Sequence, residues 1–134
     1  MRPAIAVPVL LAACLVATAA FAANTNTKIT AQFSSLAASG VVGDVTLNPM
    51  PDGEIQFHSQ LKGLAPGQQY AVFVYDSSTS CGAGTPVQIE TFTANNAGIA
   101  NWNTKAALAL TSVQSIGIQQ ASSTSLVACA GVPQ

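Results

Sequence analysis

Polar and apolar residues alternate along several short stretches of the chain, which is the pattern of half-buried β-strands. Residues 54–62 show it most clearly, because Ile55 and Phe57 fall on one face and His58 falls on the other. Residues 41–47 form a similar run, and a Pro- and Gly-containing turn separates the two. The pattern therefore predicts a β-hairpin in this part of the chain.

Turn signals about every 8–15 residues divide the rest of the chain into further short runs of the same kind. Residues 94–98 predict a hairpin connection, because Asn and Gly tolerate positive φ, and 106–110 are compatible with one helical turn. The sequence predicts one all-β domain, an eight-stranded sandwich or Greek-key barrel. Its other six strands are predicted at 28–34, 69–75, 87–93, 99–103, 115–119 and 125–130.

The N-terminus has the order of a secretory signal: a positive start, the apolar run 4–16, and small residues before a polar stretch. Cleavage is expected after Ala22 or Ala23. The apolar run is shorter than the roughly 20 residues of a membrane span. We therefore expect a signal peptide at 1–22 and a secreted or periplasmic domain at 23–134, with no transmembrane span after signal removal.

An alternative interpretation of the same segment is a lipoprotein signal. Residues 11–14 have the form of a lipoprotein processing site, with Cys14 as the lipid-bearing residue. Residues 15–23 argue against it, because this stretch is apolar where a lipoprotein usually has a polar tether. A lipid anchor at Cys14 is kept as the alternative to ordinary cleavage.

The charge of the predicted mature chain argues against nucleic-acid binding. It keeps three lysines and five carboxylates, a formal charge of −2, because the only arginine, Arg2, lies in the signal. Binding to phosphates needs a basic patch, which three scattered lysines do not make. No other partner class follows from the composition, and the sequence leaves open whether the chain forms a homodimer.

Two cysteines, Cys81 and Cys129, remain after signal removal. In an oxidising compartment an even pair favours a disulfide. The rival interpretation is a metal or redox pair, but neither a C-x-x-C spacing nor a nearby histidine supports it. A disulfide would close a loop of about 50 residues and stabilise the domain by about 3–4 kcal/mol on the chain-entropy model.

Several motifs together resemble the copper/zinc superoxide dismutases. The turn GLAPG at 63–67 leads into the strand 69–75, Cys81 follows soon after, and LVAC at 126–129 supplies the second cysteine. In that family such a turn begins a strand that carries two copper ligands, and the two cysteines form a disulfide. The resemblance extends over nearly the whole mature chain and implies the family's eight-stranded Greek-key barrel.

The metal ligands implied by the resemblance are not retained. Phe73 and Tyr75 stand where two copper histidines are expected, and Gln119 stands where a third is expected. The loop that carries the bridging and zinc histidines is cut to 82–86, and Leu126 replaces the arginine that attracts superoxide. Copper that changes oxidation state needs imidazole nitrogens, so we expect neither a cofactor nor dismutase chemistry.

The positions of the lost ligands define a candidate vestigial pocket. One interpretation is a small polar pocket; the other is that Phe73 belongs to the core and Tyr75 packs at the rim with its hydroxyl in water. The pocket would comprise Phe73, Tyr75, Asp76, Gln119 and Leu126.

Two other side chains are candidates for chemistry. His58, the only histidine, is expected on the solvent face of its strand, with a surface metal contact to Asp52 or Glu54 as the alternative. Trp102 alternates with Ala100 and is expected to pack in the core rather than to stack on a ligand.

Three hypotheses for function follow. The first is an exported superoxide dismutase-like domain without a metal site, acting as a non-enzymatic binding or structural module. The second is a dismutase with an unrecognised metal site. The third is an interaction domain similar to CHRD domains, which share the GL-x-PG turn.

Overall fold

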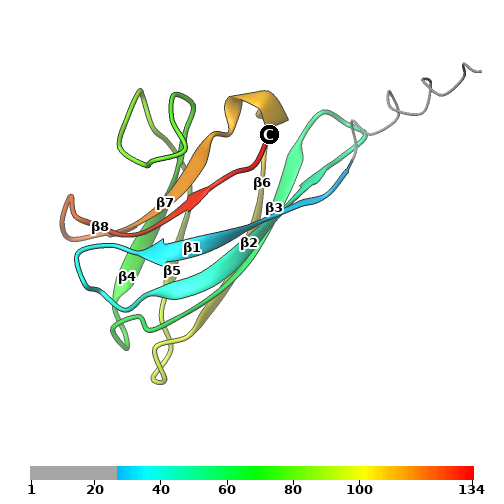
Figure 1. The fold of residues 1–134 in the computed structure, drawn as a ribbon. Coiled ribbons are helices and arrows are strands. Elements are labelled where there is room, and N and C mark those ends of the chain that lie inside the picture. The colour runs from blue at the N-terminus through cyan, green and yellow to red at the C-terminus, as the bar shows by residue number, and fades with distance from the viewer. Residues whose placement is uncertain (1–26) are drawn as a thin grey trace, which may run out of the picture.

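Eight antiparallel strands account for most of residues 27–134, the part of the chain that the computed structural model describes (Figure 1). They form a nearly closed barrel, or β-sandwich, in the order β5-β4-β7-β8-β1-β2-β3-β6. The connections from β3 to β4 and from β6 to β7 cross between distant strands, as in a Greek key. The strands are β1 (Ile29–Ser35), β2 (Val42–Pro49), β3 (Ile55–Lys62), β4 (Gln69–Tyr75), β5 (Val87–Thr93), β6 (Ala100–Ala106), β7 (Ser115–Gln120) and β8 (Leu126–Gly131).

The predicted all-β class and all eight predicted strands are confirmed. The largest shift is at the end of β6, which continues three residues beyond the prediction to Ala106. The predicted helical turn at 106–110 is displaced: a 3-10 turn, η2, occupies Leu110–Ser112. No helix within 27–134 is long and apolar enough to cross a membrane. The predicted signal peptide at 1–22 and Cys14 lie outside the described residues.

Strand β3 shows how the alternating sequence produces the core. Ile55, Phe57, Ser59 and Leu61 are buried, and the residues between them are half-buried or exposed. Ser59 is the polar exception, and its hydroxyl donates a hydrogen bond of 2.7 Å to the carbonyl oxygen of Asp44. Burial without a partner would cost this hydroxyl about 1–3 kcal/mol. The predicted hairpin of β2 and β3 is confirmed by eight paired residues on each strand.

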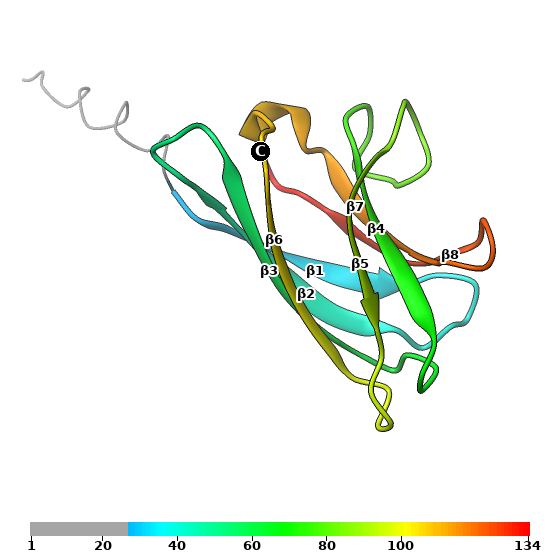
Figure 2. The ribbon, with the colours of Figure 1, turned by 180° about the vertical axis from the view of Figure 1, so that it is seen from behind.

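The predicted hairpin across 94–98 is wrong in one respect. The turn is present: the Asn95 side chain accepts hydrogen bonds from the backbone N–H groups of Ala97 and Ile99, and Gly98 has φ 74°. However, β5 pairs with β4 and β6 pairs with β3, so the two strands share no ladder. Figure 2 shows β5 and β6 leaving this turn and separating. The barrel therefore stays open between them.

Aromatic side chains fill the core beside this opening. The rings of Tyr70 and Phe92 stack with centroids 5.5 Å apart, and those of Phe92 and Trp102 with centroids 6.4 Å apart. The stack thus joins β4, β5 and β6 where backbone pairing is absent. Trp102 is 4% exposed, which confirms its predicted core position. The hydroxyl of Tyr70 accepts a hydrogen bond from the Ala65 N–H, which fixes the turn 63–67 against the same core.

We predict that Phe57→Ala lowers the free energy of unfolding by about 3–5 kcal/mol, because the ring is fully buried and its loss leaves a cavity. Urea unfolding followed by the fluorescence of Trp102, the only tryptophan, measures the change. His58→Ala, one residue along on the exposed face, is the matched control and should change stability by less than about 0.5 kcal/mol. Equal effects of the two substitutions would contradict the assignment of inner and outer faces.

Candidate functional site

Strand β4 is covered on both of its faces. Val72 and Val74 project into the core, whereas Ala71, Phe73 and Tyr75 point away from it. Ala71 and Tyr75 are nevertheless only 6% and 4% exposed, and Phe73 is half-buried. We call the outer side of β4, β7 and β8 the disulfide face, because it carries the two bonded cysteines.

Gly117 lies at the centre of the disulfide face. The register places it between Phe73 on β4 and Cys129 on β8. A Cβ at Gly117 would come within 2.9 Å of Leu126 Cδ2, 3.0 Å of Tyr75 Cε2 and 3.4 Å of Cys81 Sγ. Neighbouring side chains therefore close over a position where only hydrogen fits. Sequence patterning did not identify Gly117, because a glycine in a strand carries no chemical signal of its own.

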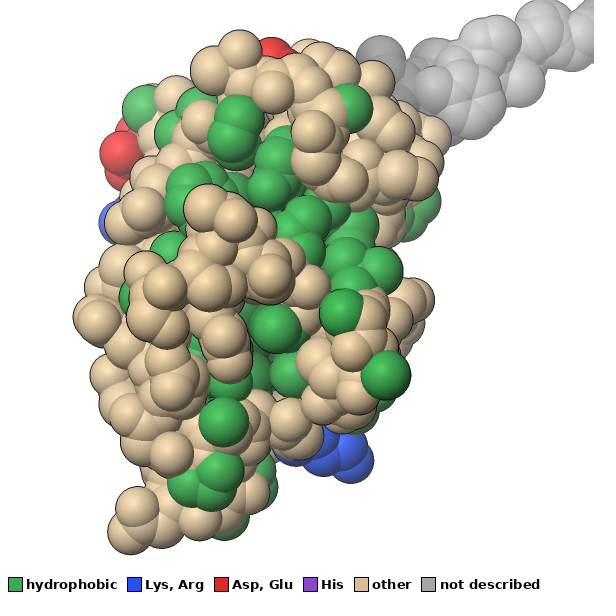
Figure 3. Space-filling model, turned by 90° about the vertical axis from the view of Figure 1, so that its left-hand side faces the viewer, with side chains coloured by type: hydrophobic (Ala, Val, Ile, Leu, Met, Phe, Trp, Pro, Cys, Tyr) green, Lys and Arg blue, Asp and Glu red, His purple; other side chains and the backbone are tan. Residues whose placement is uncertain are grey.

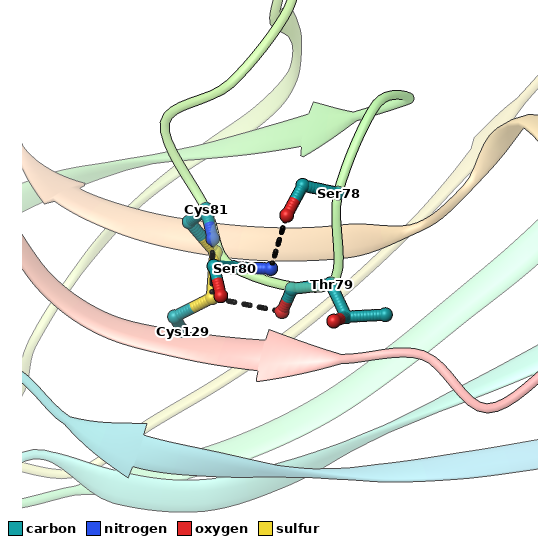
Figure 4. The surroundings of a disulfide bond; sticks show 5 residues. All are labelled: Ser78, Thr79, Ser80, Cys81 and Cys129. Atoms are coloured by element: carbon teal, nitrogen blue, oxygen red, sulfur yellow. Dashed lines mark hydrogen bonds between the residues drawn. A yellow bond between two sulfur atoms is a disulfide. The ribbon is translucent and has the colours of Figure 1, made fainter.

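The predicted disulfide is present between Cys81 and Cys129. It fixes the loop 76–86 over β7 and joins it to β8 (Figure 4). The Cys81 N–H donates to Cys129 Sγ at 3.1 Å, and the Ser80 N–H donates to Ser78 Oγ at 3.0 Å. The carbonyl oxygen of Thr79 lies 4.0 Å from Cys129 Sγ. A disulfide sulfur carries no hydrogen, so this last approach is a packing contact.

Tyr75 is more deeply placed than a rim residue. The residue as a whole is 4% exposed, so neighbouring side chains cover most of its ring. Burial raises the pKa of Tyr75 above 10.0, because the charged phenolate is poorly solvated there. The neutral phenol is thus the form present at neutral pH. Its partner on β7, Ser115, is fully buried, and the Ser115 hydroxyl has no hydrogen-bond partner.

The other candidate residues differ in their positions. Phe73 is half-buried on the disulfide face and does not belong to the core, which corrects the alternative expectation for it. Gln119 and Leu126 are paired neighbours on β7 and β8, and the Gln119 amide donates to the carbonyl oxygen of Ser123 at 2.9 Å. Asp76 is exposed in the loop and accepts a hydrogen bond from the Ser77 hydroxyl. Four of the five thus share one face, and Asp76 lies at its margin.

The surface over this region is mainly uncharged. Figure 3 views the side of the molecule on which the loop 76–86 and the turn between β7 and β8 lie. Hydrophobic side chains gather in a band through its middle, between lobes of uncharged polar surface, and charged side chains appear only near the margins. Such a surface offers no concentrated field to attract a charged substrate.

The disulfide face does not fit a copper or zinc ion. The side chains that surround Gly117 offer a phenol, a phenyl ring, an aliphatic group and sulfurs already bonded to each other. Within 27–134 no group of three or more His, Cys, Asp or Glu residues could hold a metal ion. His58 lies on β3, exposed, and pairs with Thr46 and Asn103.

Two hollows occur elsewhere, on the outer side of β1, β2 and β3. The larger, of about 460 Å³, has His58 in its lining. The smaller, of about 390 Å³, surrounds Gly43 and includes Asp44 and Lys62. Neither includes a residue of the candidate vestigial pocket.

Comparison of the whole structure with solved structures shows a superoxide dismutase-like fold. A point mutant of superoxide dismutase 5 from Candida albicans matches with a TM-score of 0.56 over 78% of this chain and 90% of that chain, at 15% sequence identity. No family model and no curated protein sequence matches the chain.

We predict that Gly117→Ala destabilises the domain by about 1–3 kcal/mol, since the added methyl group would lie 2.9 Å from Leu126 Cδ2 and 3.0 Å from Tyr75 Cε2 and so overpack the disulfide face. Removing the Leu126 contact in Gly117→Ala/Leu126→Ala should recover part of this loss. A double-mutant cycle in urea measures the coupling. Additive effects of the two substitutions would contradict the packing described above.

We predict that Cys81→Ala/Cys129→Ala lowers the free energy of unfolding by about 3–4 kcal/mol, because the disulfide restricts the unfolded chain. Proteolysis should then cut within 76–86, which the disulfide otherwise holds in place. The oxidised parent protein under the same protease is the control. An equally resistant loop in the double variant would show that side-chain packing alone fixes it.

Proposed function

We propose that this protein is an exported domain of superoxide dismutase-like fold that acts as a non-enzymatic binding or structural module. The observation that carries the proposal is the filling of the disulfide face around Gly117 by Tyr75, Leu126 and the disulfide. The resemblance in sequence assigns copper ligands to three positions on this face, which here hold Phe73, Tyr75 and Gln119. Side-chain packing takes the place of an open coordination site.

Ligand chemistry supports the same conclusion. A phenyl ring cannot ligate a metal, and Tyr75 offers only a phenol oxygen, whose ionisation burial disfavours by raising its pKa. Gln119 would offer only a weak neutral oxygen, and its amide is already bonded to the turn at Ser123. Copper in a redox enzyme needs several imidazoles, and one distant histidine cannot supply them.

The chain also lacks the positive side chain that would attract superoxide to such a site. The resemblance places an arginine at position 126, where this chain has leucine. A positive side chain at the mouth of a site raises the local concentration of an anion such as superoxide and its rate of association. Leu126 packs against the central glycine instead.

Export is part of the proposal. The N-terminal pattern is typical of a secretory signal, and disulfides such as Cys81–Cys129 persist mainly in oxidising compartments. The disulfide also favours the superoxide dismutase-like interpretation over the CHRD-like one, for which unpaired cysteines would be the supporting result. A dismutase with an unrecognised metal site is the second candidate, because the structural neighbour is a superoxide dismutase by name.

We predict that the protein purified from medium supplemented with copper and zinc contains far less than one equivalent of either metal, because the disulfide face offers no imidazole. Elemental analysis by mass spectrometry and a dismutase assay measure this, with an authentic copper/zinc dismutase carried through the same purification as the control. One equivalent of copper together with dismutase activity would overturn the proposal. His58→Ala would then show whether the only histidine holds the metal.

A further inference from the structure

Strand register aligns polar side chains in rows across the outer side of β1, β2, β3 and β6. One row across the four strands consists of Thr30, Thr46, His58 and Asn103, which pair in that order. The next row contains Asn48, Gln56 and Lys105. Neighbouring strands lie about 4.8 Å apart, and alternate residues of a strand about 6.7 Å apart, so these side chains form a grid with regular spacing.

Part of this grid is hollowed. We call it the polar hollow: a depression of about 460 Å³ lined by Lys28, Thr30, Thr46, Asn48, Gln56 and His58. It is a wide, open depression on the sheet and not an enclosed cavity. All six side chains can form hydrogen bonds, as donors, as acceptors or as both. Val42, Leu61 and Ile99 line the smaller hollow around Gly43, whereas no apolar residue lines the polar hollow.

The charged residue that lines the polar hollow is a lysine, and a second lysine lies beside it. Lys28 lines it, Lys105 lies beside Gln56 in the register, and the only histidine of the chain is in the lining. Residues 27–134 contain three lysines and five carboxylates, so two of the three lysines gather at this place in a domain of net negative charge. No carboxylate is among the lining residues. The carboxylates nearest in sequence are Asp44, two residues before Thr46, and Asp52 and Glu54 in the turn that joins β2 to β3.

We propose that the polar hollow binds an acidic oligosaccharide, one that carries carboxylate or sulfate groups. Hydroxyl and carboxamide side chains can both donate to and accept from sugar hydroxyls. The two lysines, at the two ends of the row that contains Asn48 and Gln56, supply the complementary charge for the acidic groups. The proposal gives a ligand class to the binding module proposed above and rests on it, but it does not involve the disulfide face.

Two other classes of partner fit this surface less well. A protein interface generally has an apolar core with aromatic anchors, and the lining of the polar hollow contains neither. Single-stranded nucleic acid would be expected to stack its bases on aromatic side chains, and again none lines it. In an acidic oligosaccharide, by contrast, the hydroxyl groups can bond to the hydroxyl and carboxamide side chains and the acidic groups can pair with the lysines.

Calorimetric titration of the protein with four probes tests the proposal. The probes are a heparin-derived hexasaccharide, a galacturonic acid hexamer, maltohexaose and sodium sulfate. We expect at least one acidic hexasaccharide to bind about tenfold or more tightly than both maltohexaose and sulfate, and binding to weaken as salt rises. Lys28→Gln/Lys105→Gln should weaken that binding by about tenfold, the effect of losing about 1.4 kcal/mol of interaction.

Lys62→Gln is the matched control, since Lys62 is the third lysine of the same sheet and lies outside the polar hollow. It should change the affinity less than about twofold. Tight binding of maltohexaose or of sulfate alone, an equal effect of Lys62→Gln, or no binding of either acidic hexasaccharide would each overturn the proposal. None of these binding results depends on whether the protein contains copper or zinc. The titration can therefore fail while the proposed function passes its metal analysis, and the reverse.

Discussion

Burial of β4 on both faces is the constraint on which the rest of the structure depends. Its inner residues, such as Val72, pack in the core, and its outer residues, such as Tyr75, are covered on the disulfide face. Two features make the outer cover fit: Gly117, which leaves room for Leu126 and the Tyr75 ring, and the Cys81–Cys129 bond, which fixes the loop over β7. A strand that is buried on both faces needs apolar residues at every position, so polar and apolar residues no longer alternate along it. Residues 70–75 are indeed almost continuously apolar.

Much of the fold could be predicted because its determinants are local. The alternation in β3 and the turn chemistry around Gly63 and Gly98 are short-range signals, and they indicated the strands and their order along the chain. The pairing of β5 and β6 was wrong because ladders depend on the whole barrel. A tight turn such as 94–98 ordinarily closes a hairpin, but here each flanking strand finds another partner.

The candidate site shows the same division between local and tertiary determinants. The cysteine pair could be found from residue type alone, whereas positions 73, 75, 119 and 126 were identified through the resemblance to the superoxide dismutases. The depth of Tyr75 and the role of Gly117 could not be found from the sequence, since both depend on which side chains meet across β4, β7 and β8. Likewise, the polar hollow arises from register: Thr30, Thr46 and His58 are far apart in sequence and adjacent only after the strands pair.

The two sheet faces therefore suggest different uses of one scaffold. A metal that binds only the folded chain adds its binding energy to stability, so a domain without one must be stabilised by its core and cross-links alone. Under the proposed function the disulfide face supplies such stabilisation, through an aromatic residue, a close-packed glycine and a disulfide. On this proposal the disulfide face serves packing, and ligand recognition uses another surface. The outer side of β1, β2, β3 and β6 is suited to it, because its exposed side chains can change without disturbing the core that lies on the opposite side of the same strands.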